Sequence, residues 1–320
     1  GYTMSFGNNC YKQSKIEKLI SYICDCEYEY FLNKANVLGI GLGYKVKNGF
    51  RTNQLCIQVF VTEKFSREQL PPEDLVPAIY KGIPTDVNKT GQFTICSFTQ
   101  KIVPAIGGYV IGIDYKNIGA GTLGCLVTDG KDLFILGNNH GLAASNEAPL
   151  GTKIMQPSSK YGGDVNKDTI ATLSKFVPVK FKETFKRPTN YTDCAIGKVI
   201  NKSLVSPKIA LVGMPDGIIV PKLNQKVKKV GFKTELTTGE IITINGTIEI
   251  QFNSEKTAIF KKVILTNKMS EKGDSGALLF NDNNNYVVGL LMGDNEDSTI
   301  FNPINMVLEQ LDVKLVTKNL

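Results

Sequence analysis

The sequence is poor in the residues that metal sites and disulfide frameworks require. It holds one histidine, His140, in 320 residues, and its seven cysteines are odd in number and scattered. Most of the cysteines lie in apolar runs, so we expect buried free thiols and no disulfide framework. Cys24 and Cys26 form a close pair, but a single histidine and no second close pair argue against a zinc site. No cofactor and no metal ion is implied.

Long hydrophobic runs are also missing. No stretch approaches the ~20 apolar residues of a membrane span, and the first residues lack the pattern of a secretory leader. We therefore expect a cytoplasmic protein with no membrane partner. The hydrophobic content of 42% and the charged content of 21% are ordinary, which excludes a disordered chain.

The net charge of +7 raises the question of an anionic partner. Two lysine clusters, Lys226 with Lys228 and Lys229, and Lys261 with Lys262, lie in stretches with β-like alternation. No aromatic stacking motif accompanies them. We interpret both clusters as solvated lysine faces, and nucleic acid is not the favoured partner.

The first hundred residues alternate helical and extended patterns. Apolar residues recur at helical spacing between residues 12 and 32, which predicts an amphipathic helix. Residues 37–44 and 55–61 predict a hairpin around the turn at residues 47–49, and a further strand is expected at residues 83–87. We expect residues 1–100 to form a small α/β module.

After residue 100 the pattern changes to short apolar runs separated by Gly, Asn, Asp and Pro. Many short strands with frequent turns predict a mainly β fold, either a barrel or a sandwich. The end departs from this pattern, because residues 303–311 place their apolar side chains on one helical stripe. We expect one domain over residues 101–320 that closes with this helix.

Ser275 lies in the string Gly273-Asp274-Ser275-Gly276, directly before an apolar strand. A serine between glycines can present its hydroxyl on a tight turn. The N–H groups of Gly273 and Ser275 can then converge as an oxyanion hole. The structural alternative is an ordinary turn between two strands.

Two further positions fit the same chemistry. His140 follows an apolar strand and precedes a turn of small residues, which suits a general base. Asp193 enters an otherwise apolar strand, where a carboxylate is costly unless it is hydrogen-bonded. The order His140, Asp193, Ser275 is that of the chymotrypsin triad, and it predicts a base, its orienting acid and a nucleophile.

The chain also resembles bacterial trypsin-like serine peptidases related to the plant narrow-leaf regulators. The resemblance covers nearly the whole chain. It rests on residues 36–44, 71–87, 119–127, 137–140, 156–157, 168–173, 229–234, 237–239, 273–276, 302–304 and 307–308.

This resemblance implies a chymotrypsin-like double β-barrel, with barrels at about residues 101–200 and 201–312. It also implies a protein or peptide substrate. The position six residues before the nucleophile would form the floor of the specificity pocket, which places Met269 there with Met292 as a wall. We therefore expect cleavage after uncharged, apolar residues. If Asp294 points into the pocket instead, the preference would turn to Arg or Lys.

Two other function classes stay open. One is a peptidase-fold binding or scaffold protein whose triad is latent, which labelling of Ser275 by a fluorophosphonate would distinguish. The other is a nucleic-acid-associated module, for which a steep salt dependence of binding would be diagnostic.

Overall fold

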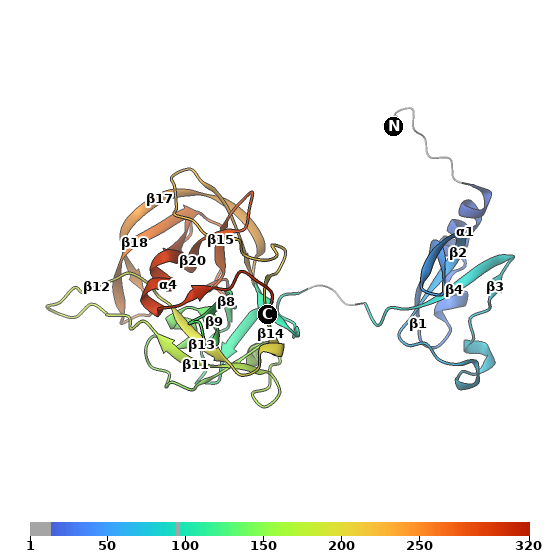
Figure 1. Cartoon of the computed structure of the whole chain (residues 1–320), viewed down its shortest axis with the longest axis horizontal. Coiled ribbons are helices and arrows are strands. Elements are labelled where there is room, and N and C mark those ends of the chain that lie inside the picture. The colour runs from blue at the N-terminus through green and yellow to red at the C-terminus, as the bar shows by residue number, and fades with distance from the viewer. Residues whose placement is uncertain (1–13, 94–96) are drawn as a thin grey trace. The chain divides into compact units, whose positions relative to one another are not determined.

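The computed structural model describes residues 14–93 and 97–320. The chain divides into two compact units, Gly1–Cys96 and Ser97–Leu320 (Figure 1). No helix in the part that the structure describes is long and apolar enough to cross a membrane.

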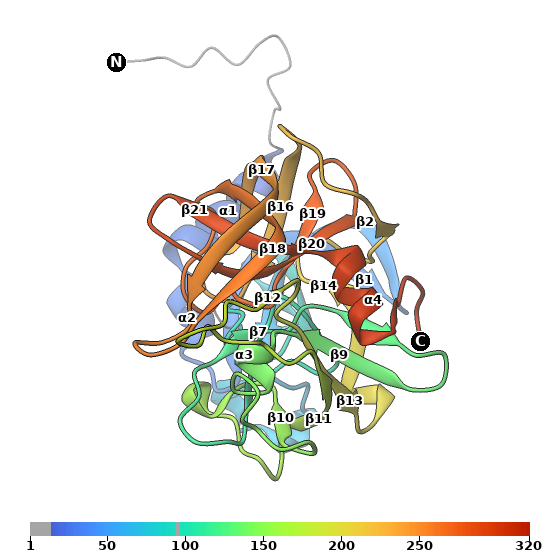
Figure 2. The same ribbon diagram turned by 90° about the vertical axis from the view of Figure 1, so that its left-hand side faces the viewer.

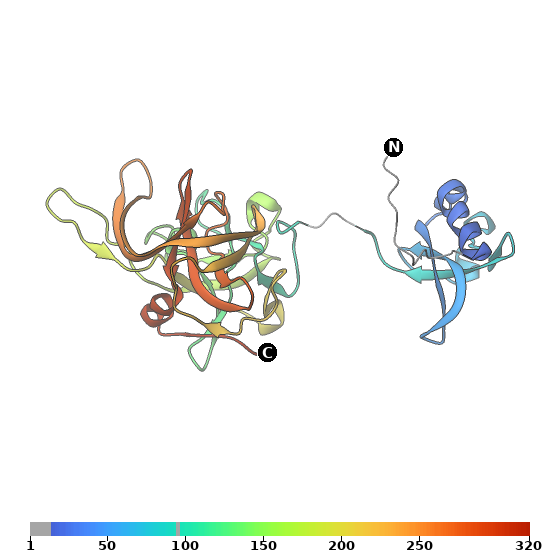
Figure 3. The same cartoon turned by 90° about the horizontal axis from the view of Figure 1, so that it is seen from above.

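The N-terminal unit is a four-stranded sheet with its helices on one face (Figure 3). Its elements are α1 (Lys15–Cys26), α2 (Tyr28–Leu32), β1 (Val37–Lys47), β2 (Phe50–Val61), β3 (Ile79–Tyr80) and β4 (Ile83–Lys89), with short 3-10 turns at Arg67–Gln69 and Pro72–Asp74. The strand order is β1-β2-β4-β3. Ile20, Ile23 and Phe31 of the helices pack on Ile57 and Val59 of β2, so the apolar stripe of the helix meets the apolar face of the sheet.

The predicted hairpin is confirmed, because β1 and β2 pair antiparallel around Asn48 and Gly49, both with positive φ. The prediction of one helix between residues 12 and 32 is wrong in detail. Within its described part the helix breaks at Glu27, whose backbone leaves the helical region. The N–H of Glu27 donates to the carbonyl of Ile23, which is the last hydrogen bond of α1. Residues 12 and 13 lie outside the described part.

The second unit is built on two eight-stranded sheets (Figure 2). The first has the order β22-β8-β9-β13-β11-β10-β6-β7. Its strands are β6 (Val110–Ile113), β7 (Gly121–Thr122), β8 (Leu126–Thr128), β9 (Leu133–Gly137), β10 (Lys153–Met155), β11 (Thr169–Phe176), β13 (Ala195–Val199) and β22 (Lys314–Leu315).

The second sheet has the order β12-β18-β17-β16-β19-β20-β15, with β21 paired to β18 and β20. Its strands are β12 (Thr189–Asn190), β15 (Gly217–Ile218), β16 (Lys226–Gly231), β17 (Glu235–Gln251), β18 (Thr257–Asn267), β19 (Leu278–Asn281), β20 (Tyr286–Asp294) and β21 (Ser298–Pro303). A separate pair joins β5 (Ala105–Gly107) to β14 (Val205–Ile209).

Few helices interrupt these sheets. They are α3 (Asn139–Leu142), α4 (Ile304–Leu311) and short 3-10 turns at Ser159–Tyr161 and Lys202–Leu204. The predicted closing helix is α4, which buries Ile304, Val307, Leu308 and Leu311. The predicted fold class is confirmed: the chain is mainly β, with barrel-like sheets preceded by a small α/β module.

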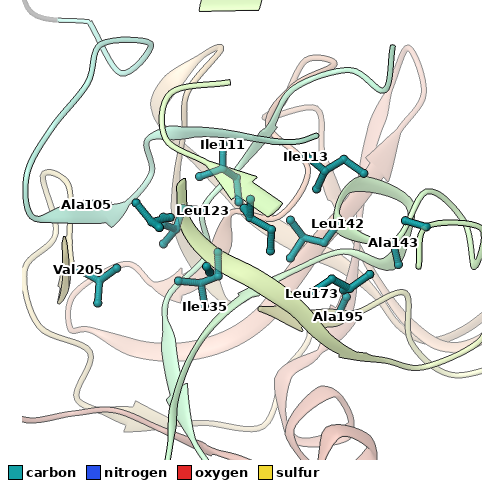
Figure 4. Close-up of a cluster of buried hydrophobic side chains, with 14 of the residues drawn as sticks. Ala105, Ile111, Ile113, Leu123, Ile135, Leu142, Ala143, Leu173, Ala195 and Val205 are labelled. Atoms are coloured by element: carbon teal, nitrogen blue, oxygen red, sulfur yellow. The ribbon is translucent and has the colours of Figure 1, made fainter. Parts of the chain in front are cut away.

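A cluster of buried aliphatic side chains packs against the first sheet (Figure 4). Leu142 and Ala143, at the end of α3, belong to it together with Leu123, Ile135 and Leu173. Because α3 is anchored by these side chains, the polar residues at its start are held in one place.

The described cysteines are free, as expected, but they are not uniformly buried. Cys56, Cys125 and Cys194 are buried, whereas Cys24 is partly exposed and Cys26 is exposed on the last turn of α1. The lysine clusters also differ from the prediction. Lys229 lies on the inward side of β16 and is fully buried, so it is not part of a solvated face.

Candidate active site

His140 lies in the first turn of α3, directly after β9. Asn138 starts this turn, and its carbonyl accepts the N–H of Leu142 at 2.8 Å. The side chain of the buried Asn139 bonds to Asn146 and to the carbonyl of Val177. These contacts fix the backbone on both sides of His140 and leave its ring 33% exposed.

Asp193 follows β12 and is completely buried. Its Oδ1 accepts the backbone N–H of His140 at 3.0 Å, and its Oδ2 lies 2.5 Å from Nδ1 of the His140 ring. The N–H of Asp193 donates to Oδ1 of Asn302, and its carbonyl accepts from Asn138 Nδ2. A buried carboxylate held at both oxygens and along its backbone has little freedom to turn.

The pair has a defined proton arrangement. An ionised carboxylate can only accept, so Nδ1 of His140 donates to Asp193 and Nε2 is left as the basic nitrogen. Burial opposes protonation of the ring, but the charge of Asp193 and its hydrogen bond raise the pKa of His140 above its usual range. His140 is thus a stronger base than an isolated imidazole.

Ser275 lies in a loop of residues 270–277, which we call the Ser275 loop, between β18 and β19. Gly273 and Gly276 both have positive φ, at 113° and 98°. A Cβ at Gly273 would lie 2.8 Å from the ring of Phe232, so glycine is required there by conformation and by space. The hydroxyl of Ser275 donates to the carbonyl of Met292 at 3.4 Å, and within the described residues no hydrogen bond joins it to His140.

The backbone of the Ser275 loop has two unused donors. The carbonyl of Gly273 accepts from the hydroxyl of Thr122, and the carbonyl of Ser275 accepts the N–H of Thr122. The N–H groups of Gly273 and Ser275 have no acceptor among the described residues. Two free N–H groups beside a hydroxyl are what an oxyanion hole requires.

Asp274 lies between these two donors, and its side chain is fully buried. Its carboxylate accepts the N–H groups of Lys233, Thr234 and Glu271 and the hydroxyl of Thr234. Lys229 Nζ lies 3.8 Å from Oδ2. Because all its acceptor capacity is used structurally, Asp274 is unsuited to proton transfer.

Two cavities adjoin Ser275, and His140, Lys272 and Ser275 line both. The Ile118 cavity, of about 170 Å³, is lined further by Ile118, Gly121 and Leu142. The Asp294 cavity, of about 400 Å³, is lined further by Asp193, Phe252, Met292, Asp294 and Ile300. The three residues of the predicted triad therefore meet at one cavity, although they come from α3 and two separate loops.

The three predicted pocket residues are not equally placed. Met292 and Asp294 line the Asp294 cavity. Met269 is not among the residues that line either cavity: it is 3% exposed and packs in the core with Val227 and Ile241. Its backbone is held there, since its N–H donates to Thr299 and its carbonyl accepts from Thr237.

The carboxylate of Asp294 already has partners. It accepts the hydroxyl of Ser270 at 2.8 Å and lies 3.3 Å from Lys268 Nζ. Phe252, directly after β17, packs its ring perpendicular to that of His140, with centroids 6.3 Å apart. The cavity wall thus combines apolar side chains with polar ones, and the charge of Asp294 is partly neutralised.

The supporting roles of Asn138, Asn302, Thr122 and Lys229 were not predicted from the sequence, although all four lie in segments that carry the resemblance. Asn302 was part of the resemblance, but its contact with Asp193 spans 109 positions and has no local pattern. No group of three or more His, Cys, Asp or Glu within residues 14–93 and 97–320 is placed to hold a metal ion.

Among known families, residues 23–89 match the model described as the NARROW LEAF 1 N-terminal domain. This match is consistent with the resemblance seen at residues 36–44 and 71–87. No curated protein matches the chain significantly.

Several solved structures are similar to the chain. Protease A of Thermobifida fusca is 19% identical with a TM-score of 0.48, and the alignment covers 67% of this chain and 98% of that one. The chymotrypsin of Cellulomonas bogoriensis is 18% identical with a TM-score of 0.47 and the same two coverages. The Nocardiopsis protease NAPase is 15% identical with a TM-score of 0.48, covering 66% of this chain and 98% of that one.

Proposed function

We propose that the chain is a serine endopeptidase that hydrolyses peptide bonds through Ser275, His140 and Asp193. The observation that carries the proposal is the junction at the Asp294 cavity. There a buried carboxylate orients the His140 ring, and Ser275 lines the same space. These are the components of a nucleophile, a base and an orienting acid.

In the proposed reaction, Ser275 Oγ attacks the carbonyl carbon of the substrate while Nε2 of His140 takes the hydroxyl proton. The N–H groups of Gly273 and Ser275 donate hydrogen bonds to the developing oxyanion. The C–N bond then breaks, and His140 returns the proton to the leaving amine. Water, activated by His140 in the same way, hydrolyses the acyl-enzyme.

The Asp294 cavity suggests a preference for apolar side chains at the cleaved bond. Its walls include Phe252, Met292 and Ile300, and Lys268 and Ser270 already satisfy Asp294. Burial of a medium apolar side chain contributes roughly 1.5–3 kcal/mol. A cationic substrate side chain would have to compete with Lys268 for the same carboxylate.

A binding protein with a latent triad is the second candidate. The hydrogen bond of Ser275 to the carbonyl of Met292, in place of one to His140, favours it. Hydrogen bonds between a nucleophile and its base are often long before substrate arrives, so the same geometry is compatible with the endopeptidase.

Turnover by the Ser275→Ala variant tests the proposal. We expect wild-type cleavage of a denatured protein substrate and of fluorogenic peptides, with kcat lower by ~10⁴–10⁶ in the variant. Equal thermal unfolding of the two chains serves as the control for folding. Cleavage by the variant at the wild-type rate would refute the proposal.

A further inference from the structure

Lys229 places an ammonium group inside the second sheet. It lies on β16, between β17 and β19, opposite Thr237 on one side and Leu279 on the other. Its side chain is 0% exposed, as is that of Asp274. A lysine buried to this extent requires partners for its charge and its three donors.

The partners of Lys229 lie at the base of the Ser275 loop. Nζ donates to the hydroxyl of Thr234 at 2.6 Å and to the carbonyl of Glu235 at 2.9 Å, and it lies 3.8 Å from Oδ2 of Asp274. The hydroxyl of Thr234 in turn donates to the same Oδ2 at 2.6 Å. Lys229, Thr234 and Asp274 thus form one connected buried network.

Asp274 connects this network to the loop that carries the oxyanion donors. Its carboxylate binds the N–H of Glu271, and its own N–H donates to the Glu271 carbonyl, which closes the loop on itself. Gly231 leaves room for this arrangement, because a Cβ there would lie 2.3 Å from Oδ1 of Asp274. The direction of the Gly273 and Ser275 N–H groups therefore depends on where the Asp274 carboxylate is held.

We propose that Lys229 is a positioning residue for the Ser275 loop, and that its protonated form is needed to hold Asp274 and keep the oxyanion donors in place. The inference rests on the proposed function of the same site. Loss of the proton would leave Asp274 as a buried carboxylate without a counter-ion, and the loop would relax.

Asp274 is the charged group that faces Lys229 among the described residues packed around it. From β17 and the loop before it, Glu235 and Lys233 supply only backbone groups to the network, and their side chains are exposed. Glu271 likewise contributes its N–H and has an exposed side chain. From β19 the neighbour in register is the apolar Leu279.

Burial lowers the pKa of Lys229 to about 8, while Asp274 acts in the opposite direction. The ammonium group of Lys229 is therefore present below about pH 8 and is lost above it. Activity is therefore expected to fall as the pH rises through about 8. Between about pH 8 and the ordinary lysine pKa of ~10.4, the unfolded chain binds more protons at this residue than the folded chain does. The free energy of unfolding therefore rises with pH in this interval, and loss of activity there is not caused by unfolding through Lys229.

The test compares the pH profiles of kcat/KM for the wild type and for Lys229→Arg. The wild type should lose about tenfold per pH unit above pH 8, reversibly. Arginine stays protonated, so in K229R the fall should move up by about one unit or more. Lys226→Arg, an exposed lysine on the same strand, is the matched control and should leave the profile unchanged.

A second variant covers the case in which arginine does not fit the buried site. Lys229→Met should lower kcat by ~10²–10³ at pH 7, the scale of a lost oxyanion donor, with the chain still folded by circular dichroism. Independently of activity, the unfolding free energy of the wild type relative to K229R should rise between pH 8 and 10.

Three outcomes would overturn the inference. One is a folded K229R whose alkaline fall is unmoved, and another is a K229M variant with wild-type kcat at pH 7. The third is a wild-type chain that neither cleaves peptides nor reacts at Ser275. That last result would remove the proposed function as well, whereas the first two leave it standing.

Discussion

Replacing Asp193 by asparagine tests the pairing of the proposed base. The substitution keeps the shape of the side chain, and Oδ1 can still accept the backbone N–H of His140. The amide group then faces Nδ1 of the ring where Oδ2 lies now. Because an amide donates, Nδ1 must become the acceptor, and the proton moves to Nε2. Nε2 can then no longer accept the proton of Ser275.

The expected loss in kcat is about 10⁴-fold, which corresponds to about 5 kcal/mol in the activation free energy. The pH profile should change as well. In the wild type, activity rises with pH as His140 loses its proton, at a pKa that Asp193 holds above the usual ~6.5. Without that charge, burial lowers the pKa of His140, and the acid limb of the residual activity should move to lower pH.

Steady-state kinetics from pH 5 to 8 measures both effects. Asp132→Asn, a partly exposed carboxylate paired with Lys198, is the control and should change neither kcat nor the limb. The reasoning fails if D193N keeps more than a tenth of the wild-type kcat with its acid limb in place.

Two further substitutions probe the surroundings of the triad. Asn302→Ala leaves the buried N–H of Asp193 without its acceptor, so urea titration should show a loss of about 1–3 kcal/mol in unfolding free energy; an unchanged value would contradict this role. Asp294→Asn should alter the preference at the cleaved bond little, because Lys268 and Ser270 already compensate that carboxylate. A peptide library in which the wild type strongly selects Arg or Lys, and D294N does not, would show the opposite.

The strands and the candidate triad were predictable because their patterns are local. Ser275 stands between glycines that the turn needs, and His140 and Asp193 each adjoin an apolar strand. The order of His140, Asp193 and Ser275 along the chain then linked these three separate motifs into one candidate triad. The hairpin of the N-terminal unit was predictable for the same reason, since Asn48 and Gly49 suit its positive φ angles.

The parts that escaped prediction depend on contacts distant in sequence. Lys229 shares a strand with two other lysines, and alternation alone places it on the side of Val227, but only the tertiary position of Asp274 explains a charge there. Counting six residues back from Ser275 predicts that Met269 lies in the pocket. The hydrogen bonds to Thr237 and Thr299 instead turn its side chain into the core.

The reactivity of Ser275 tests the central claim most directly. A fluorophosphonate reacts with a serine only where a base and an oxyanion hole activate it, so peptide mass spectrometry after labelling locates the nucleophile. The account predicts a single adduct on Ser275, formed more slowly below pH 6 and absent from Ser275→Ala. An intact, folded chain that forms no adduct, or an adduct that persists in Ser275→Ala, would contradict it.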